Sequence, residues 1–414
     1  EAPPWAYKWQ SPEDFGKDPI GAVHTSGLRP ANWEDLDKGA GREPKKPTAG
    51  QREWWVEFGG MHDTIKDAEW IRDELFRINI GLWDYVKNDS PKFKEANRNK
   101  ELVWLNYVPG KRESRRLLGD YVMTQRDYAE KIVHPDTIAY AGWGVDIHHP
   151  WGFFARGNLY FSAFRQKVSI PYRCLYSRNI SNLMMAGRDV SVSHIALGAV
   201  RVMRTTCMMG QAAGTAAVIA VRRYTTPRGV YENHLDELQD RLLKDGCYLV
   251  GRPNSDPNDL ARKAKVSASS FAVIADPRVA GRGAARDRVS LTPENVVNGW
   301  NRSVEGVANS WSPDPEQSLP QWLELDFDKP LQFNTIHVTF QLAKMAAEAY
   351  RLDVTEGGGA WRAVARVEGN TQRRRVQSFE AATADRLRLV IERPGREGST
   401  PRVCEIRVYN EPEK

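Results

Sequence analysis

The stretch Leu183–Arg223 constrains the fold of this chain more than any other. It opens with the apolar run Leu183-Met184-Met185-Ala186 and breaks at Gly187 into a polar turn. A long helical pattern then runs on from Gly198, and its small residues recur on one face: Gly210, Ala213, Gly214 and Ala217. A strand, a turn and a helix with a small-residue face predict a backbone that approaches another group closely. An ordinary strand–turn–helix unit with a packing face is the alternative interpretation.

The motifs in this stretch resemble those of a known family. A-G-R-x-x-S-x-S-H, followed by G-x-V-R-V-M and M-G-Q-A-A-G-T-A-A, is similar to the C-terminal flavin-contacting motif of the FAD-dependent oxidoreductase family. The resemblance implies FAD as cofactor and a partial FAD/NAD(P)-binding (glutathione-reductase-like) domain. It also implies cofactor contacts from eight residues: Ala186, Gly187, Arg188, Asp189, His194, Gly198, Val200 and Arg201. In this interpretation a turn at Gly198 directs the next helix toward the flavin, and the Gly210/Gly214 face packs on the rest of the nucleotide-binding fold.

A basic segment upstream carries the second family signature, G-K-R-E-S-R-R-x-x-G-D-Y, over residues 110–121. A guanidinium group gives permanently charged, bidentate contacts. We therefore expect Arg112 or Arg115 to stabilise an anionic substrate group or the reduced flavin. An internal pair with Glu113 is the alternative.

The segment Gly142–Trp151 contains the best candidate for proton transfer. Asp146 and His148 point to one face of an extended chain. A carboxylate beside an imidazole fixes its tautomer and raises its basicity, as a base that removes a hydroxyl proton requires. D-x-H also resembles the corresponding family segment, so we predict Asp146 and His148 as catalytic. A metal site with His149 is a weaker alternative, because no third ligand follows nearby and no metal pattern occurs elsewhere.

Two further elements precede these motifs. Glu53–Gly60 predicts a short strand that ends in a glycine turn, and its Trp54 and Trp55 belong either to a substrate pocket or to a core. Asp63 predicts the cap of a helix from Thr64 to about Val86. Both elements resemble the substrate-side region of the same family.

The C-terminal part alternates apolar and polar residues with a period of two, which predicts an antiparallel β-sandwich or jelly roll. The order N-V-V-N-G, N-S-W and Q-W-L-E-L-D-F-D-K-P, closed by E-I-R-V-Y, resembles discoidin, or factor 5/8 type C, domains. The resemblance implies a galactose-binding-like fold and carbohydrate binding. Trp300 and Trp361 are candidate sugar platforms, whereas Trp311 is expected in the core.

The G-x-G-x-x-G turn that binds a dinucleotide pyrophosphate is absent from the sequence. Gly281-Arg282-Gly283 lacks the third glycine and falls inside the β module. The chain is therefore expected to be a fragment of a longer flavoenzyme and not to bind FAD tightly alone. A family member that has lost its cofactor is the alternative.

The composition of the chain limits the classes of partner that it is expected to bind. The 59 basic and 53 acidic residues are scattered, which indicates solvated surface charge and excludes a nucleic-acid footprint. The apolar run Thr205–Val221 is too short and too rich in Ala and Gly for a membrane span. The four cysteines form no metal pattern, and Cys207 and Cys404 are expected to be buried thiols.

These observations predict an α/β plus all-β chain in four parts. An irregular segment, 1–50, precedes an oxidoreductase region, 51–250, and a linker, 251–263, leads to the β-sandwich, 264–412. The predicted function is oxidation by FAD of a hydroxyl-bearing small molecule or glycan, in an exported protein with a glycan-binding module. A non-catalytic carbohydrate-binding protein on a degenerate flavoprotein scaffold is the alternative.

Overall fold

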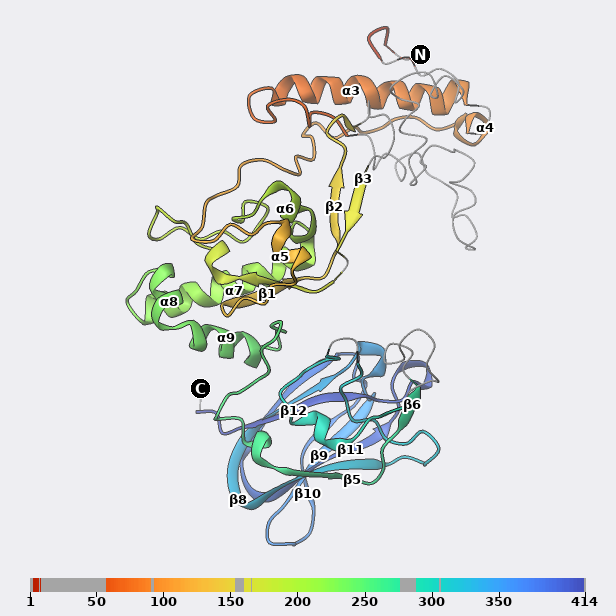
Figure 1. Cartoon of the computed structure of the whole chain (residues 1–414). Helices are drawn as coiled ribbons and strands as arrows, with labels where there is room; N and C mark the ends of the chain where they lie inside the picture. The colour runs from red at the N-terminus through yellow and green to blue at the C-terminus, as the bar shows by residue number, and fades with distance from the viewer. Residues whose placement is uncertain are drawn as a thin grey trace. The chain divides into compact units, whose positions relative to one another are not determined.

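The computed structural model describes residues 3–6, 8, 57–90, 93–152, 160–164, 166–275, 288–304 and 307–412. The chain forms two compact units, Glu1–Tyr231 and Glu232–Lys414 (Figure 1). The first contains helices and short strands and the second is mainly β. The predicted order of an α/β region followed by a β-sandwich is therefore confirmed.

The predicted linker, 251–263, lies within the second unit. It ends in the 3-10 helix η7 (Leu260–Lys263), and its Asn254 and Ala261 are fully buried. The four-part division of the chain stays a prediction, as does the irregular character of 1–50, most of which lies outside the described residues.

The long helix of the first unit is α3 (Ala68–Asp84), which continues into the π-helical turn η4 (Tyr85–Asp89). The helix begins four residues later than the predicted start at Thr64. The reason is that the Asp63 carboxylate accepts hydrogen bonds from the amides of Ile65 and Lys66 and closes a separate turn. Trp54 and Trp55 lie outside the described residues. The shorter helices are α4 (Lys94–Asn97), α5 (Gln125–Ala129) and α8 (Pro227–Asn233).

Four strands of this unit form two antiparallel hairpin-like pairs. β1 (Thr137–Ala141) pairs with β4 (Val168–Pro171), and β2 (Val145–His148) pairs with β3 (Tyr160–Ala163). The only parallel pairing among the described residues is the bridge between Met123 and Val192. That bridge joins the chain just after the basic segment to the A-G-R-x-x-S-x-S-H motif.

The stretch Leu183–Arg223 differs from its predicted form in three places. Its opening apolar run makes a single bridge, Met184 to Tyr176, instead of a strand. Gly198 lies inside α6 (His194–Val200), and the break before α7 (Met203–Arg222) falls at Arg201-Val202. α7 buries the face that carries Met209, Ala212 and Ala216, whereas Gly210 and Gly214 are exposed with nothing packed where a Cβ would lie.

Two further findings concern α7. Cys207 is exposed on it, so the prediction of a buried thiol is wrong there, while Cys404 is buried as predicted. No helix in the described ranges is both long and apolar enough to cross a bilayer.

The second unit is organised by two strands of 20 residues each, β8 (Gln321–Phe340) and β11 (Arg374–Arg393). Their first pairing region joins 321–326 of β8 to 386–391 of β11. In this region β5 (Lys265–Ala268) lies beside β8, and β9 (Ala349–Thr355) lies beside β11. The outermost strand is β10 (Arg362–Val367), which pairs with β9. Their second region joins 331–339 to 374–384 and adds β12 (Val403–Tyr409). Both strands therefore pass from a five-stranded layer into a three-stranded one, and register shifts mark the passage.

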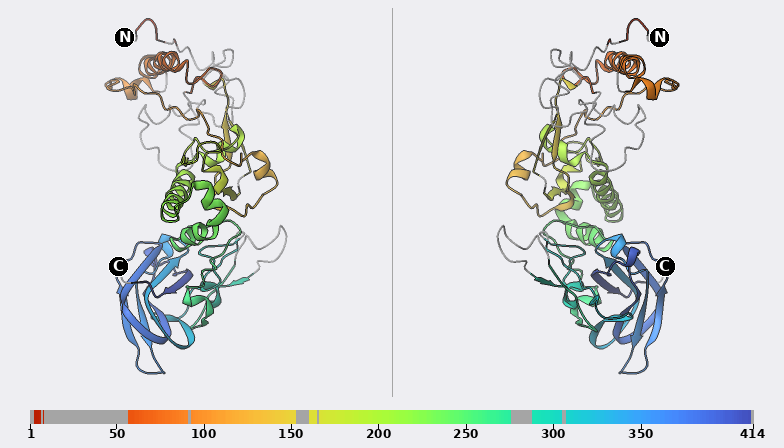
Figure 2. Two further views of the ribbon diagram at one scale, coloured as in Figure 1. Left: turned by 90° about the vertical axis from the view of Figure 1, so that its left-hand side faces the viewer. Right: turned by 90° about the vertical axis from the view of Figure 1, so that its right-hand side faces the viewer.

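The predicted β-sandwich is confirmed, and Figure 2 shows its strands curving around a common core. Trp311 is fully buried in this core, as predicted, and its indole nitrogen donates to the Ser270 carbonyl at 2.9 Å. A smaller antiparallel pair, β6 (Val273–Ala275) and β7 (Arg288–Ser290), covers a second apolar cluster around Leu291.

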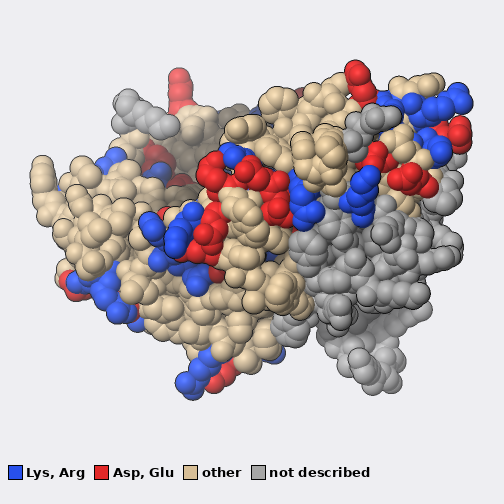
Figure 3. Space-filling model, turned by 90° about the horizontal axis from the view of Figure 1, so that it is seen from above, with Lys and Arg blue, Asp and Glu red and all other residues tan. Residues whose placement is uncertain are grey.

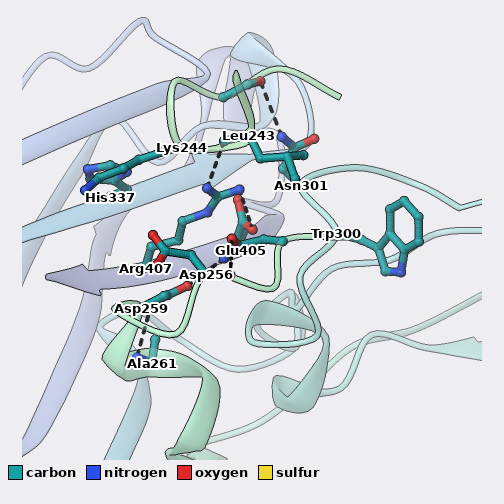
Figure 4. A network of polar contacts seen from close by, with 12 residues as sticks. Leu243, Lys244, Asp256, Asp259, Ala261, Trp300, Asn301, His337, Glu405 and Arg407 are labelled. Carbon is teal, nitrogen blue, oxygen red and sulfur yellow. Dashed lines mark hydrogen bonds and ion pairs between the residues drawn. The ribbon is translucent and has the colours of Figure 1, made fainter. Parts of the chain in front are cut away.

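The helix α9 (Leu235–Lys244) belongs to the second unit, and strand side chains hold its C-terminal end. Arg407 donates to the Leu243 carbonyl at 2.8 Å (Figure 4). Arg374 donates to the Lys244 carbonyl at 2.7 Å. Asn301 donates to the Cys247 carbonyl just beyond the helix at 2.9 Å. Cations at this end also complement the helix dipole.

Two titratable groups in this network change the stability of the fold in opposite directions as the pH falls. Burial, aided by Arg374 and Arg407, lowers the pKa of His337 to about 3 from an ordinary 6.5. His337 therefore contributes stability at neutral pH that is lost as the pH falls below 6.5. Burial raises the pKa of Asp259 to about 6 from 3.8, so its contribution grows over nearly the same acid range.

We predict that His337→Gln removes only the first effect. Between pH 6.5 and pH 4.5 the variant should gain about 2 kcal/mol of unfolding free energy relative to wild type, since each unit of pH is worth about 1.4 kcal/mol for one such group. Urea denaturation at the two pH values measures this difference. An equal gap between variant and wild type at both values would show that His337 is not kept neutral by burial.

Candidate functional site

A pocket of about 520 Å³ lies in the first unit. One wall is the apolar side of α3, with Ala68, Ile71 and Leu75. The opposite wall is polar and consists of the segment 109–114, the end of β2 and its following turn, and the start of α6. The two segments singled out in the sequence for chemistry, and part of the flavin-type motif, thus meet at one cavity.

Glycines hold these walls together. Gly198 is buried against the backbone of β2, and a Cβ there would lie 2.8 Å from the Asp146 carbonyl oxygen. Gly152 has a positive φ of 50°, and a Cβ on it would lie 2.2 Å from the Glu57 carbonyl oxygen. Larger residues at either point would separate α6, β2 and residue 57, so the pocket depends on these close approaches.

His148 stands at the centre of the polar wall. Its Nδ1 lies 2.5 Å from Oε2 of Glu57, and its Nε2 lies 3.7 Å from Oδ1 of Asp146. Asp146 and His148 do share one face, as the alternation predicts. The carboxylate that bonds the imidazole is nevertheless Glu57, which is 91 residues away in sequence.

Arginines flank this histidine on both sides. Arg112 Nη1 lies 2.6 Å from Oε1 of Glu57. Arg201 Nη2 lies 3.1 Å from the Asp146 carbonyl oxygen and 3.3 Å from its Oδ2. Burial and the nearby charge of Arg112 lower the pKa of Arg201 from its ordinary value, against the opposing effect of Asp146. The polar wall is therefore a row in which basic and acidic side chains alternate: Arg112, Glu57, His148, Asp146 and Arg201.

A second histidine–carboxylate pair lines the same pocket. His194, the first residue of α6, has Nδ1 at 2.8 Å from Oε2 of Glu113, which also pairs with Arg116. Ser193 caps α6 by accepting the Ala196 amide and fixes where His194 stands. Glu113 thus pairs with Arg116 and His194. Figure 3 shows acidic and basic side chains intermingled on the described part of this end of the molecule.

Six of the twelve predicted site residues line the pocket: Arg112, Asp146, His148, His194, Gly198 and Arg201. The other six do not line it. Arg115 is exposed, and its charge acts on Asp63. Val200 is fully buried within α6.

The remaining four predicted residues, Ala186 to Asp189, form a turn beside the basic segment. The Asp189 carboxylate accepts the Gly187 amide at 3.0 Å and closes the turn. Arg188 donates to the Lys111 carbonyl at 2.8 Å, and Lys111 lines the pocket. The cofactor roles of these residues stay predictions.

Glu57 is not among the predicted site residues, and Glu113 was expected only as an alternative partner for arginine. Glu57 follows the two tryptophans in W-W-V-E-F-G-G and precedes the glycine turn. A lone acid in an extended apolar segment is the available signal, because such a residue needs a partner once its neighbours are buried.

The comparisons with known proteins agree with the order of an α/β region followed by a β-sandwich. Residues 9–242 match the family model described as FAD dependent oxidoreductase, and residues 280–406 match the model of the F5/8 type C domain. No curated protein matches the chain.

Solved structures similar to part of the chain include SpGH29, with 21% identity, a TM-score of 0.28, and coverage of 44% of this chain and 32% of that one. The chain therefore spans about a third of the length of that protein. A second similar structure is a module of Clostridium perfringens, CpGH89CBM32-5 in complex with GalNAc-β-1,3-galactose. It shows 18% identity and a TM-score of 0.28, and the match covers 36% of this chain and 99% of that one. Chitosan-binding module 1 from a chitosanase/glucanase of Paenibacillus sp. IK-5 shows 19% identity and a TM-score of 0.28, and the match covers 37% of this chain and 98% of that one. Because the first family model spans more than half of the 414 residues, this chain belongs to the FAD dependent oxidoreductase family.

Proposed function

We propose that the first unit is the substrate-side part of an FAD-dependent oxidoreductase that oxidises a hydroxyl-bearing substrate, with a carbohydrate as the candidate class. The observation that carries the proposal is the Glu57–His148 pair in a 520 Å³ pocket, beside residues of the flavin-type motif. A pocket of this size with convergent polar groups is typical of small-molecule sites.

The described residues fit the flavin end of FAD. The N-cap position of α7, Val202, makes no side-chain cap, and the Thr205 amide already donates to the Val202 carbonyl. The amides of Met203 and Arg204, the first two of this helix of 20 residues, are the ones that could meet an electron-rich group. Ala186 and Gly187 offer partly exposed backbone in the preceding turn. We propose that Gly187, Arg188 and Arg201 help to hold the cofactor in a glutathione-reductase-like domain. When bound, FAD supplies an acceptor for the hydride of the substrate carbon.

The chain's own residues handle the proton. Glu57 accepts the Nδ1 hydrogen of His148 and so fixes the tautomer in which Nε2 carries the lone pair that takes a proton. As the C–H bond breaks, the hydroxyl proton passes to Nε2 and the C–O bond becomes a carbonyl. Asp146, held by Arg201, lies beside Nε2 and stabilises the imidazolium that forms.

The second unit is proposed to hold the protein on a glycan, and the protein is proposed to be exported. The F5/8 type C match and the sandwich fold support glycan binding. Trp300 and Trp361 remain candidate platforms, and both are partly exposed. A non-catalytic glycan-binding protein is the second candidate function, because this match is independent of the flavin-type motif.

One experiment separates the two candidates. The full-length protein is purified, mixed with FAD, freed of excess cofactor and titrated anaerobically with a panel of sugars. We expect a retained flavin absorption band that one class of sugar bleaches. A protein that retains no flavin after reconstitution, yet binds glycans, would support the non-catalytic candidate.

A further inference from the structure

The arginines in the pocket lining suggest what its ligand carries. Lys111, Arg112 and Arg201 line the pocket together with Glu57, Glu113 and Asp146, so the lining cations and carboxylates are equal in number. Arg116, which is not part of the lining, also pairs with Glu113. Three histidines line the pocket as well: His148, His149 and His194.

The two guanidinium groups in this set stand at either end of the row that contains His148. Arg112 contacts Glu57 through Nη1, and Arg201 contacts Asp146 through Nη2. Arg201 is mostly buried, with 16% of its side chain exposed, and the charge of Arg112 acts unfavourably on it. A ligand carboxylate that contacts both guanidinium groups would form charge-assisted hydrogen bonds in a partly desolvated site, where charge pairs are strongest.

We propose that the pocket recognises a carboxylate-bearing polyhydroxy substrate, a sugar acid of the uronate type, through Arg112 and Arg201. A carboxylate matches the planar fork of a guanidinium, whereas a neutral hydroxymethyl group does not. The apolar wall of Ala68, Ile71 and Leu75 then faces the carbon skeleton. His148, between the two arginines, faces a hydroxyl group. This inference rests on the proposed function and names its substrate class.

Calorimetric titration of the full-length protein tests the inference without flavin or turnover. The probes are three pairs that differ only at the terminal carbon: galacturonate and galactose, glucuronate and glucose, mannuronate and mannose. We expect one acid to bind at least ~10-fold more tightly than its parent sugar. That preference should fall below ~3-fold in Arg201→Gln and in Arg112→Gln.

Matched variants keep the result interpretable. Arg126→Gln removes an exposed charge of the same unit, paired with Glu130 outside the pocket, and should keep the full preference. Arg201→Lys keeps the charge and should keep part of it, which excludes simple unfolding. Equal binding of acid and sugar in all three pairs, or a preference that survives both Gln variants, would overturn the inference. Failure to oxidise the preferred acid would instead count against the proposed function alone.

Discussion

Replacing His148 by glutamine should abolish most substrate oxidation while leaving the fold intact. The imidazole is the group of the polar wall that Glu57 orients for proton uptake, and glutamine keeps a polar side chain but accepts no proton. Loss of a general base typically costs 10²–10⁴-fold in rate, so we expect kcat/KM to fall by about 10³-fold. Stopped-flow bleaching of the flavin with the substrate identified in the sugar panel measures the effect.

Two companion variants show whether the loss is chemical. Glu57→Gln should lower the rate less than His148→Gln, because Glu57 acts through the histidine as a positioning residue. His234→Gln, on a histidine of the second unit, should match wild type. If His148→Gln retained wild-type kcat/KM, the pair would have no part in proton transfer.

Replacing Arg407 by methionine should destabilise the second unit by about 3–5 kcal/mol. Its side chain is 2% exposed, and its Nη2 lies 2.9 Å from Oε1 of Glu405, which is also buried. The same guanidinium group satisfies the Leu243 carbonyl at the end of α9. The variant therefore leaves a buried carboxylate without its nearest cation. Hydrogen exchange of the β12 amides in increasing urea measures the loss within this unit alone.

The double variant Arg407→Met/Glu405→Leu should recover most of that stability, because an apolar pair of similar volume removes the unpaired charge. Arg393→Met, which breaks an exposed pair with Glu368, should change stability by less than about 0.5 kcal/mol. A double variant no more stable than Arg407→Met would place the cost in the α9 contact instead of the ion pair.

Local sequence patterns predicted the parts of the molecule that depend on neighbouring residues. The period of two located the strands of the sandwich. Alternation along residues 145–148 put Asp146 and His148 on one face. Both predictions need only the geometry of an extended chain.

Patterns failed where distant segments decide the outcome. Glu57 reaches His148 only because Gly152 lets the two backbones meet, and no local spacing encodes that contact. Gly198 was predicted to open a turn, yet its role is to let a helix lie on a strand. Cys207 sits in an apolar sequence but on the exposed side of α7, since a sequence gives the periodicity of a helix more readily than its packing direction.

The hydrogen bonds from three side chains to the C-terminal end of α9 determine where a fragment of this protein should begin. A fragment that started at the proline-rich segment near residue 253 would discard the helix and leave Arg374, Arg407 and Asn301 facing empty space. Such a fragment invites misfolding for reasons unrelated to the sandwich itself. A recombinant sugar-binding reagent made from this chain should therefore begin at Glu232, where the compact unit begins.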